Sequence, residues 1–309
     1  MQTPRCLVKQ FLTTPIYSLR SRYLPRTVQN VFKTVGLIAR YDNKHALKLA
    51  EELSEYLTKK NLTVQIEDTL GGKVNVNAEF TPLKAMKTDF LITIGGDGTI
   101  LRTCMTIPKP EPPILAINMG IRGFLTEIEP KEACAAVDKI LQGDFTVEKC
   151  CKLAVSTGEG EIPDGLNDVV VFAAEPSKVF YAQIFKDEEP ILKCQADGLI
   201  VATQTGSTGY SLSAGGPVLD MGVDGFVLTP ICSLSVFRSI VFPADTKVTI
   251  KAIRPKEMLV IVDGRFKQNI MSENACLTIT RSANVTSFIR FKSDFYDRLR
   301  NRLLFKGMG

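Results

Sequence analysis

The stretch Asp89-Phe90-Leu91-Ile92-Thr93-Ile94-Gly95-Gly96-Asp97-Gly98-Thr99 decides how the first half of the chain folds. Its first six residues are apolar enough for a strand buried on both faces, which is typical of a parallel sheet. Apolar residues from Thr99 onward return at helical spacing. Glycines between a strand and a helix allow a sharp turn, and the free N–H groups at a helix N-terminus attract phosphate. The stretch therefore predicts an α/β unit with a phosphate-binding loop.

The segments around this loop alternate between strand and helix. Strands are predicted at residues 35–39, 62–66 and 113–117, and an amphipathic helix between the first two presents Ala46, Leu49, Ala50, Leu53 and Leu57 on one face. Strand, helix, strand, helix, strand is the order of a parallel α/β sheet. We therefore predict an α/β N-terminal domain with a parallel sheet, whose folded part begins near Thr34.

The character of the sequence changes after about Glu129. A helix is predicted over residues 130–142, and helical periodicity then largely disappears until about Arg290. Short β-rich runs replace it at residues 152–156, 168–172, 179–185, 199–202, 247–252, 259–262 and 275–280. This pattern is typical of an all-β domain. The tail is helical again, with Phe295, Leu299 and Leu303 on one face and Ser293 as the expected N-cap.

These patterns divide the chain into four segments: residues 1–33, 34–129, 130–290 and 291–309. The first is a basic extension, because residues 1–41 hold seven Lys or Arg and no Asp or Glu. We interpret it as unstructured, in a cytoplasmic protein. The alternatives are a mitochondrial or plastid transit peptide and a basic arm that touches an anionic partner. The others are the α/β domain, an all-β C-terminal domain and a C-terminal helix.

Composition excludes several classes of protein. No apolar run approaches the ~18 residues of a membrane-spanning helix, so no membrane association is expected. The basic charge belongs to the arm, so no nucleic-acid partner is expected either. Eight cysteines include no Cys-x-x-Cys pair, which favours a reducing compartment over a disulfide scaffold. The single histidine, His45, cannot form a His-x-x-x-His zinc site, and we expect it to face solvent near a helix start.

Asp97 is the unusual residue of the glycine-rich loop. A carboxylate in an anion site is repelled by its ligand, so it needs a metal ion beside it or a proton to accept from a nucleophile. The alternative is a helix N-cap in a tight turn; the flanking glycines and the buried strand favour function. No Gly-x-x-x-x-Gly-Lys-[Ser/Thr] loop occurs, and Leu101 stands where a Rossmann loop has its last glycine.

Two further motifs point to nucleotide chemistry. Residues 195–217 lead from an apolar strand into a loop dense in glycines and hydroxyls. Hydroxyls donate to phosphate or ribose, and Tyr210 offers a ring for stacking on a base. Asn167-Asp168 places an amide and a carboxylate at a strand start, where they can contact a ribose diol and a base edge, although Asn-Asp is also ordinary turn chemistry.

Taken together, these motifs resemble the NAD kinase family. The GGDGT loop lies at 95–99, an N-x-G-x-x-G-F-L segment at 118–125, the Asn-Asp pair at 167–168 and an Asp-Gly turn at 263–264. GGDGT alone is shared with diacylglycerol and sphingosine kinases. The run at 197–217, similar to the family's D-G-x-x-x-x-T-P-T-G-S-T-A-Y-x-x-S-A-G-G-P, separates them.

The resemblance implies phosphoryl transfer from ATP or polyphosphate to the adenosine ribose 2′-hydroxyl of NAD, giving NADP. It implies that residues 130–290 bind NAD, that the terminal helix returns to the first domain, and that the protein is a homo-oligomer, a dimer or tetramer. Mg²⁺ or another divalent metal is expected with the donor, and no residue is assigned as a metal ligand. Asp97 is the implied catalytic base, and the implied nucleotide-binding residues are Gly96, Gly98, Thr99, Arg102, Phe124, Asn167, Asp168, Asp197, Thr208, Gly209, Tyr210 and Ser213.

The sequence departs from the family pattern at several positions. These are Gln204 for proline, Gly209 for alanine, Arg122 at a position that is often apolar, Arg265 for glutamine, and no histidine within residues 230–238. Two alternatives stay open. One is a diacylglycerol-type lipid kinase, which shares GGDGT, and the other is a non-catalytic NAD(P)-binding protein of the same fold. Intact Asp97 argues against the second.

Overall fold

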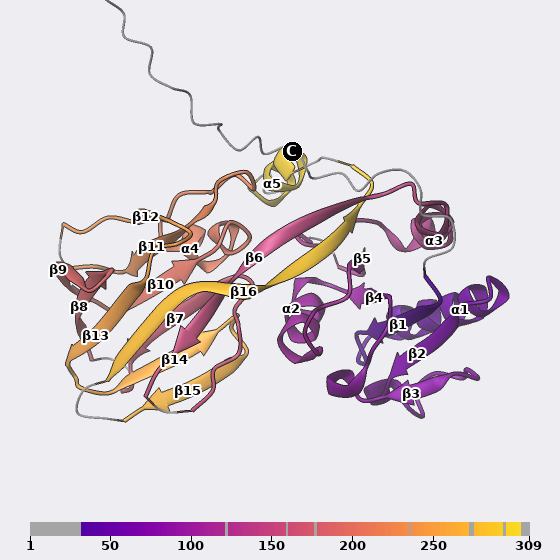
Figure 1. Cartoon of the computed structure of the whole chain (residues 1–309), viewed down its shortest axis with the longest axis horizontal. Coiled ribbons are helices and arrows are strands. Elements are labelled where there is room, and N and C mark those ends of the chain that lie inside the picture. Colours follow the sequence, from indigo (N-terminus) through magenta and orange to yellow (C-terminus); the bar gives the residue numbers. More distant parts are fainter. Residues whose placement is uncertain are drawn as a thin grey trace, which may run out of the picture.

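The computed structural model describes residues 32–120, 123–158, 160–175, 178–234, 236–271, 275–292 and 295–303. Three predictions concern residues outside these ranges. They are the basic arm at residues 1–31, the departure from the family pattern at Arg122, and the N-cap of the last helix at Ser293. Figure 1 shows the α/β and β-rich parts side by side, with the last helix above them.

The first half of the chain forms a parallel sheet, as predicted. Its strands, in spatial order, are β3 (Glu79–Thr81), β2 (Thr63–Glu67), β1 (Thr34–Ala39), β4 (Phe90–Gly95) and β5 (Ile114–Asn118). Every residue of β4 is buried, as its apolar sequence requires. Helix α1 (Lys44–Lys59) starts at Asn43, whose side chain accepts the N–H groups of His45 and Ala46. Helix α2 (Asp97–Thr106) starts at the glycine-rich loop.

This sheet continues into the second half of the chain. The 15-residue strand β16 (Cys276–Arg290) pairs in parallel with β5 through Phe288 and Ile114. The same strand pairs antiparallel with β6 (Thr146–Ser156) and β13 (Val248–Arg254), and β8 (Phe180–Lys186) and β9 (Glu189–Ala196) complete the sheet. Figure 1 shows β6 and β16 running together from one part of the molecule to the other. The two halves therefore share a sheet of ten strands.

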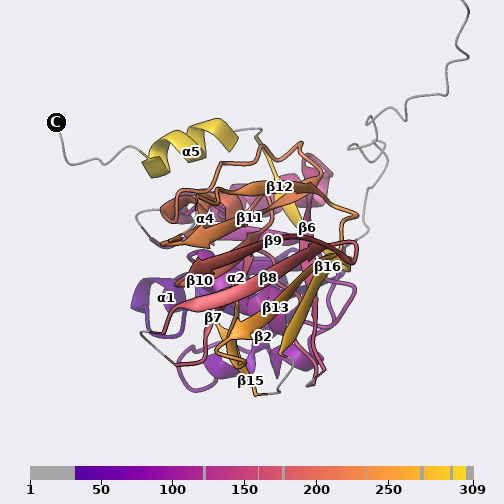
Figure 2. The same ribbon diagram turned by 90° about the vertical axis from the view of Figure 1, so that its left-hand side faces the viewer.

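A second, antiparallel sheet of six strands makes the C-terminal part all-β, as predicted. Its strands, in spatial order, are β12 (Ile240–Pro243), β11 (Gly225–Ile231), β10 (Gly198–Ala202), β7 (Asp168–Ala173), β14 (Met258–Val262) and β15 (Phe266–Ile270). Side chains from β7, β10 and β14 share one core with side chains from β8, β13 and β16. The two sheets thus pack face to face in this part. Figure 2 looks onto β8, β9 and β13 from outside.

Two helices of the second half pack on the first half. Helix α3 (Ala133–Gln142), which the sequence analysis placed with the β-rich segment, shares a hydrophobic core with α1. Helix α5 (Phe295–Leu303) sets Phe295 edge-on to Phe124, with ring centroids 5.6 Å apart. Arg298 Nη1 of the same helix lies 3.8 Å from Glu127 Oε2. The C-terminal helix therefore returns to the loop after β5, as predicted.

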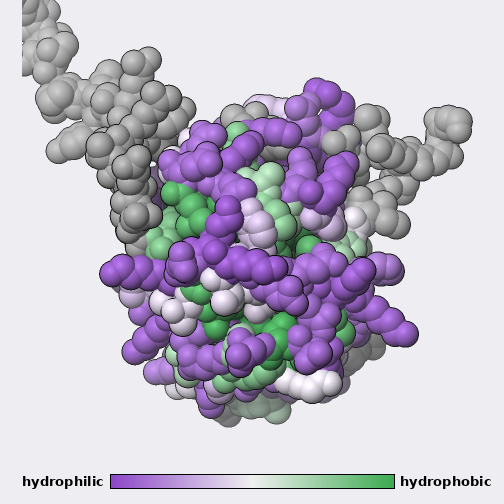
Figure 3. Space-filling model, turned by 90° about the vertical axis from the view of Figure 1, so that its right-hand side faces the viewer, coloured by the Kyte–Doolittle hydropathy of each residue, from purple (hydrophilic) through white to green (hydrophobic). Residues whose placement is uncertain are grey.

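The surface of the α/β part is mostly hydrophilic, with scattered apolar residues (Figure 3). Among the helices in the described ranges, none combines the length and the apolar character needed to cross a bilayer. His45 is exposed, which confirms the interpretation of the single histidine as a solvent-facing residue.

Candidate active site

The glycine-rich loop lies at the carboxyl end of β4, the edge where parallel sheets bind ligands. Gly96 is the N-cap residue of α2, and a Cβ built on it would meet no atom within 4 Å. A Cβ on Gly95, in contrast, would lie 2.2 Å from Thr99 Oγ1, so this position requires glycine. The loop is therefore tightly packed at Gly95 and open at Gly96, so a phosphate can approach the N-terminus of α2 closely.

Asp97 is the first residue of α2 and is half-buried. Each of its carboxylate oxygens accepts the Phe124 N–H at 3.1 Å, and Oδ1 also accepts the Leu125 N–H at 3.1 Å. The N-cap alternative for Asp97 is wrong, because Gly96 occupies that position. Asp97 instead ties the start of α2 to the loop that follows β5.

Two residues assigned to the nucleotide have structural partners. The Phe124 side chain is 5% exposed and packs in a core that includes Leu101, so it presents little surface for stacking. Arg102 Nη2 donates to Glu67 Oε2 at 2.7 Å, and Nη1 contacts the other oxygen of this buried carboxylate. This hydrogen bond raises the pKa of the Arg102 guanidinium. Arg102 thus joins α2 to the end of β2.

Asn167 and Asp168 lie at the start of β7, as the strand pattern predicted. The Asp168 carboxyl group is buried, and this burial, together with the nearby carboxylate of Asp263, raises its pKa to about 7. The side-chain oxygen of Asn167 is buried and lacks a hydrogen-bond partner among the described residues. A buried polar atom without a partner is costly unless a ligand or water satisfies it, so this pair has the properties of a binding site.

The turn between β14 and β15 connects this pair with the glycine-rich loop. Asp263 Oδ1 accepts the N–H groups of Asn167 at 2.7 Å and Asp168 at 3.1 Å, and Oδ2 accepts the Leu166 N–H at 2.9 Å. Two residues later, Arg265 Nη2 donates to the Gly98 carbonyl at 2.5 Å. One short turn therefore holds both the Asn167-Asp168 pair and the start of α2.

The hydroxyl-rich segment after β10 forms a short 3₁₀ turn, Gly206–Thr208, and helix α4 (Tyr210–Ser213). A Cβ on Gly206 would lie 1.9 Å from the Asn167 carbonyl oxygen, so the backbones touch here. The hydroxyls of Thr203 and Thr205 donate to the Leu166 carbonyl at 2.6 and 2.8 Å, and that of Thr208 donates to the Thr205 carbonyl at 2.9 Å. The first two hydroxyls hold the segment against Leu166, the residue before the Asn167-Asp168 pair, and the third stabilises the segment itself.

Four predicted site residues remain: Gly209, Tyr210 and Ser213, which follow the 3₁₀ turn, and Asp197, which precedes β10. A Cβ on Gly209 would lie 3.9 Å from Asp168 Oδ2, and Tyr210 and Ser213 are exposed on the adjoining helix. Asp197 lies at the far end of β10, because it precedes that strand whereas Ala202, at the other end, pairs with Asp168. At ~3.3 Å per residue, the strand separates Asp197 from Asp168 by about 17 Å. Burial raises the pKa of the Tyr210 hydroxyl, and the carboxylates of Asp168 and Asp197 act in the same direction, so Tyr210 lies near both.

Gln204, which replaces the family's usual proline, is buried and uses its side chain. Its Oε1 accepts the Cys151 thiol at 2.7 Å, and its Nε2 donates to the Val223 carbonyl. Gln204 thus links β6 to the turn before β11, which a proline could not do. The role of Asp263 was missed by sequence reasoning. The only signal for it was the Asp-Gly dipeptide after an apolar strand.

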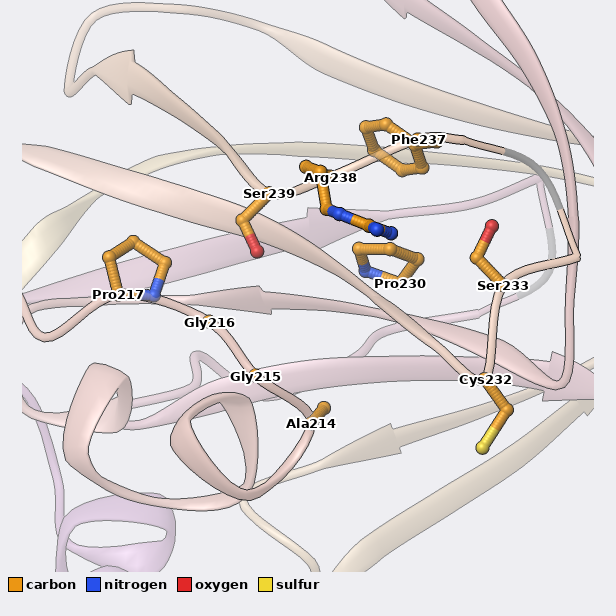
Figure 4. A pocket seen from close by; sticks show the side chains of 10 residues that line it. All are labelled: Ala214, Gly215, Gly216, Pro217, Pro230, Cys232, Ser233, Phe237, Arg238 and Ser239. Atoms are coloured by element: carbon orange, nitrogen blue, oxygen red, sulfur yellow. The ribbon is translucent and has the colours of Figure 1, made fainter.

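A pocket of about 520 Å³ adjoins helix α4 (Figure 4). It lies between the turn at residues 214–217 and the segment 230–239, and its lining residues are Ala214, Gly215, Gly216, Pro217, Pro230, Cys232, Ser233, Phe237, Arg238 and Ser239. Figure 4 shows the Arg238 guanidinium extending over Pro230 into the pocket. The volume is within the range of small-molecule sites, and the guanidinium favours an anionic group.

Two sequence profiles match almost the whole described chain. The profile of the ATP-NAD kinase N-terminal domain matches residues 35–145, and that of the C-terminal domain matches residues 166–291. The NAD kinase of Methanothermobacter thermautotrophicus is 35% identical over 277 residues, covering 89% of this chain and 97% of the relative. The NAD kinase of Thermococcus sibiricus is 37% identical over 266 residues, covering 85% and 96%.

Solved structures of the family have the same architecture. A yeast NADH kinase complexed with NADH superposes with a TM-score of 0.81 at 23% identity, covering 91% of this chain and 90% of that one. An Archaeoglobus fulgidus NAD kinase in complex with ATP superposes with a TM-score of 0.71 at 26% identity, covering 87% and 99%. With both domains matched in order and the GGDGT and Asn-Asp motifs in one site, the chain belongs to the NAD kinase family and is a kinase.

Proposed function

We propose that this protein transfers the terminal phosphoryl group of ATP to the adenosine ribose 2′-hydroxyl of NAD, giving NADP and ADP. The observation that carries the proposal is the turn at residues 263–265. Through Asp263 it positions the buried Asn167-Asp168 pair, and through Arg265 it contacts the phosphate-binding start of α2. A ribose-binding acid and a phosphate loop are therefore held in fixed relation, which phosphoryl transfer between two nucleotides requires.

The reaction assigns a role to Asp97. The 2′-oxygen forms a bond to the terminal phosphorus, the bond from that phosphorus to the bridging oxygen of ADP breaks, and the hydroxyl proton passes to the Asp97 carboxylate. The N–H groups of Phe124 and Leu125 fix the orientation of this carboxylate. An ionised carboxylate offers about four lone-pair sites, so holding the loop does not prevent Asp97 from accepting a hydroxyl.

The dinucleotide would lie along the β-rich part. Asp168, when ionised, accepts hydrogen bonds from ribose hydroxyls, and Asn167 Oδ1 accepts one from a base or ribose. The exposed ring of Tyr210 offers a stacking surface. The neighbouring pocket, with the Arg238 guanidinium inside it, suits the phosphates or the second ribose. Asp197, whose N–H donates to the Ile231 carbonyl next to the pocket residue Cys232, adjoins the same path.

Mg²⁺ is expected with the donor nucleotide. In the ranges that the structure describes, no group of three or more His, Cys, Asp or Glu side chains is placed to hold a metal ion. In phosphoryl-transfer sites Mg²⁺ is commonly held by one or two carboxylates and by the substrate phosphates. Asp97, the acidic residue in the first turn of α2, would be the carboxylate that helps to hold such an ion, and the metal would neutralise charge on the transferring group.

Homo-oligomerisation is part of the proposal. Leu234, Val236 and Val241 are 72%, 91% and 48% exposed, and Val241 belongs to the edge strand β12. Exposed apolar residues beside an unpaired strand edge favour contact with a second chain. The lipid-kinase alternative is not retained, because both halves of the chain match NAD kinase profiles.

The test is to incubate the protein with NAD, ATP and Mg²⁺ and to measure NADP with an NADP-specific dehydrogenase. Parallel reactions replace ATP by polyphosphate and NAD by NADH, which identifies the donor and the acceptor. We expect NADP to form at a rate that depends on protein and Mg²⁺. Binding of NAD without NADP formation under any of these conditions would favour the non-catalytic alternative.

A further inference from the structure

Arg265 is a charged side chain for which the roles above use only its contact with the Gly98 carbonyl. It is exposed, and it follows a turn in which Asp263 and Gly264 have positive φ angles of 50° and 66°. Strand pairing between Val262 and Phe266 and the three N–H groups that Asp263 accepts fix this turn. This fixed turn places the Arg265 guanidinium at the first turn of α2, where Nη2 donates to the Gly98 carbonyl.

Arg265 is a cation beside the N-terminus of a helix, whose partial positive charge attracts anions rather than cations. Two other arginines near this edge of the sheet have carboxylate partners. Arg40 Nε pairs with Asp42 at 2.7 Å, and Arg102 pairs with Glu67. Within the described ranges Arg265 has no such carboxylate; its partner is the Gly98 carbonyl.

We propose that Arg265 is a further catalytic residue, which binds the terminal phosphate of the donor nucleotide beside the glycine-rich loop. This inference rests on the proposed function and adds a residue to its site. The side chain exchanges the Gly98 carbonyl for phosphate oxygens, while the turn stays in place. A Cβ on Gly98 would lie 3.0 Å from Nη2, so glycine here leaves room for the guanidinium.

The chemistry of the guanidinium suits this task. It is always charged, and its planar set of donors matches phosphate oxygens in a bidentate way. The family's usual glutamine at this position can donate a hydrogen bond but carries no charge. In phosphoryl transfer an arginine beside the transferring group stabilises the charge that spreads over its oxygens. This chain therefore brings to the phosphate a cation that the usual family residue does not supply.

The test compares Arg265→Ala and Arg265→Gln with Lys267→Gln, an exposed control on the same hairpin. Loss of one positioned donor to a transition state typically lowers kcat ~10²–10³-fold, so we expect this loss for Arg265→Ala. The Lys267 variant should keep the wild-type rate. The KM for NAD and the melting temperature should stay near those of the wild type, and added guanidinium ion should restore part of the Arg265→Ala rate.

Direct binding provides the second measurement. Arg265→Ala should weaken binding of ATP but leave binding of ADP unchanged, since the contact is to the terminal phosphate. If kcat stays within a few-fold of the wild type, or if ATP and ADP lose affinity equally, the proposal is overturned. If Arg265→Ala lowers both the rate and the melting temperature, and guanidinium ion does not restore the rate, Arg265 has a structural role between the two domains and the proposal is likewise overturned. If the wild-type protein makes no NADP, the proposed function fails, and the ATP-against-ADP comparison still decides the role of Arg265.

Discussion

Asp168 and Asp263 are joined by two reciprocal hydrogen bonds: the Asp168 N–H donates to the side-chain Oδ1 of Asp263 at 3.1 Å, and the Asp263 N–H donates to the main-chain carbonyl of Asp168 at 3.0 Å. Both carboxyl groups are buried. Burial raises the pKa of each, although the backbone N–H donors to Asp263 act in the opposite direction on it. Asp168 therefore has a pKa of about 7, while the Asp263 carboxyl group, whose pKa is also raised, is held by main-chain N–H groups.

The stability of the protein should fall as pH rises toward neutrality because of Asp168. Its pKa is about 7 in the fold against an ordinary value of 3.8, so the folded state binds more protons across that window and loses stability with rising pH. Asp168→Asn should therefore raise the melting temperature above pH 7 and have little effect below pH ~4. Thermal unfolding of both proteins from pH 4 to 8 measures this difference, with the exposed Asp245→Asn as the control. A stabilisation independent of pH would contradict the assignment.

Binding of NAD should depend on the same titration. Below neutral pH Asp168 is protonated and offers the ribose hydroxyls a weaker acceptor, so the KM for NAD should rise as pH falls through about 7. Asp168→Ala should raise this KM by the equivalent of ~1.5–3 kcal/mol, typical of a hydrogen bond to a charged group, and should abolish its pH dependence. An unchanged KM with reduced stability would show that Asp168 is only a structural turn residue.

Arg290 should be essential for stability. Its Nη1 donates to the Leu125 carbonyl at 3.0 Å and lies 3.1 Å from Glu127 Oε2, while Nε pairs with Glu148 at 2.8 Å. Arg290→Met leaves the buried Glu127 without this partner, so unfolding free energy should fall by ~3–5 kcal/mol. Arg281→Met is the matched control on β16, because Arg281 pairs with exposed Asp224 and its loss should cost ~0–1 kcal/mol. Urea denaturation compares the two, and equal losses would contradict this account.

Deletion of residues 1–30 should leave NADP formation and the melting temperature nearly unchanged. The prediction rests on the charge pattern, which ends at Asp42, and on the first strand, which begins at Thr34. The truncated and full-length proteins should be compared in both assays at low and high salt. A large loss in either assay would show that the arm contributes to the fold or to an assembly.

Periodicity predicted most strands and helices, because burial of β4 on both faces and the apolar stripe of α1 are local properties of the sequence. Strands with weaker patterns were missed. β9 and β12 are edge strands, and β11 contains Pro230 although every residue of it is buried. The long strand β16 was predicted only in part, since its pairing shifts register between Arg281 and Val285. That strand carries the sheet from one half to the other, which no local pattern indicates.

The sequence indicated which motifs form the candidate site, but not which residues of these motifs contact one another. The turn at residues 95–99 and the Asn167-Asp168 pair were predicted as binding elements because glycines, strand ends and carboxylates are typical of phosphate and ribose sites. The partners of Asp97 lie 27 and 28 residues away, and the Glu67 partner of Arg102 lies on another strand. Such contacts depend on tertiary packing, so Phe124 and Arg102 were assigned to the nucleotide although their side chains have structural partners.

The central claim is that Asp97 accepts the proton of the 2′-hydroxyl, and Asp97→Asn tests it. Asparagine keeps one acceptor oxygen for the Phe124 and Leu125 N–H groups, so the loop should hold and the melting temperature should change little. Asp97→Ala removes that oxygen and should also destabilise the loop.

The decisive measurement is the single-turnover rate of NADP formation from ATP and NAD by the wild-type and Asp97→Asn proteins. Loss of a general base typically lowers the rate ~10²–10⁴-fold, so we predict a decrease of that size with NAD affinity nearly unchanged. A near-normal rate for Asp97→Asn would contradict the account and leave Asp97 as a residue that only ties α2 to the loop after β5.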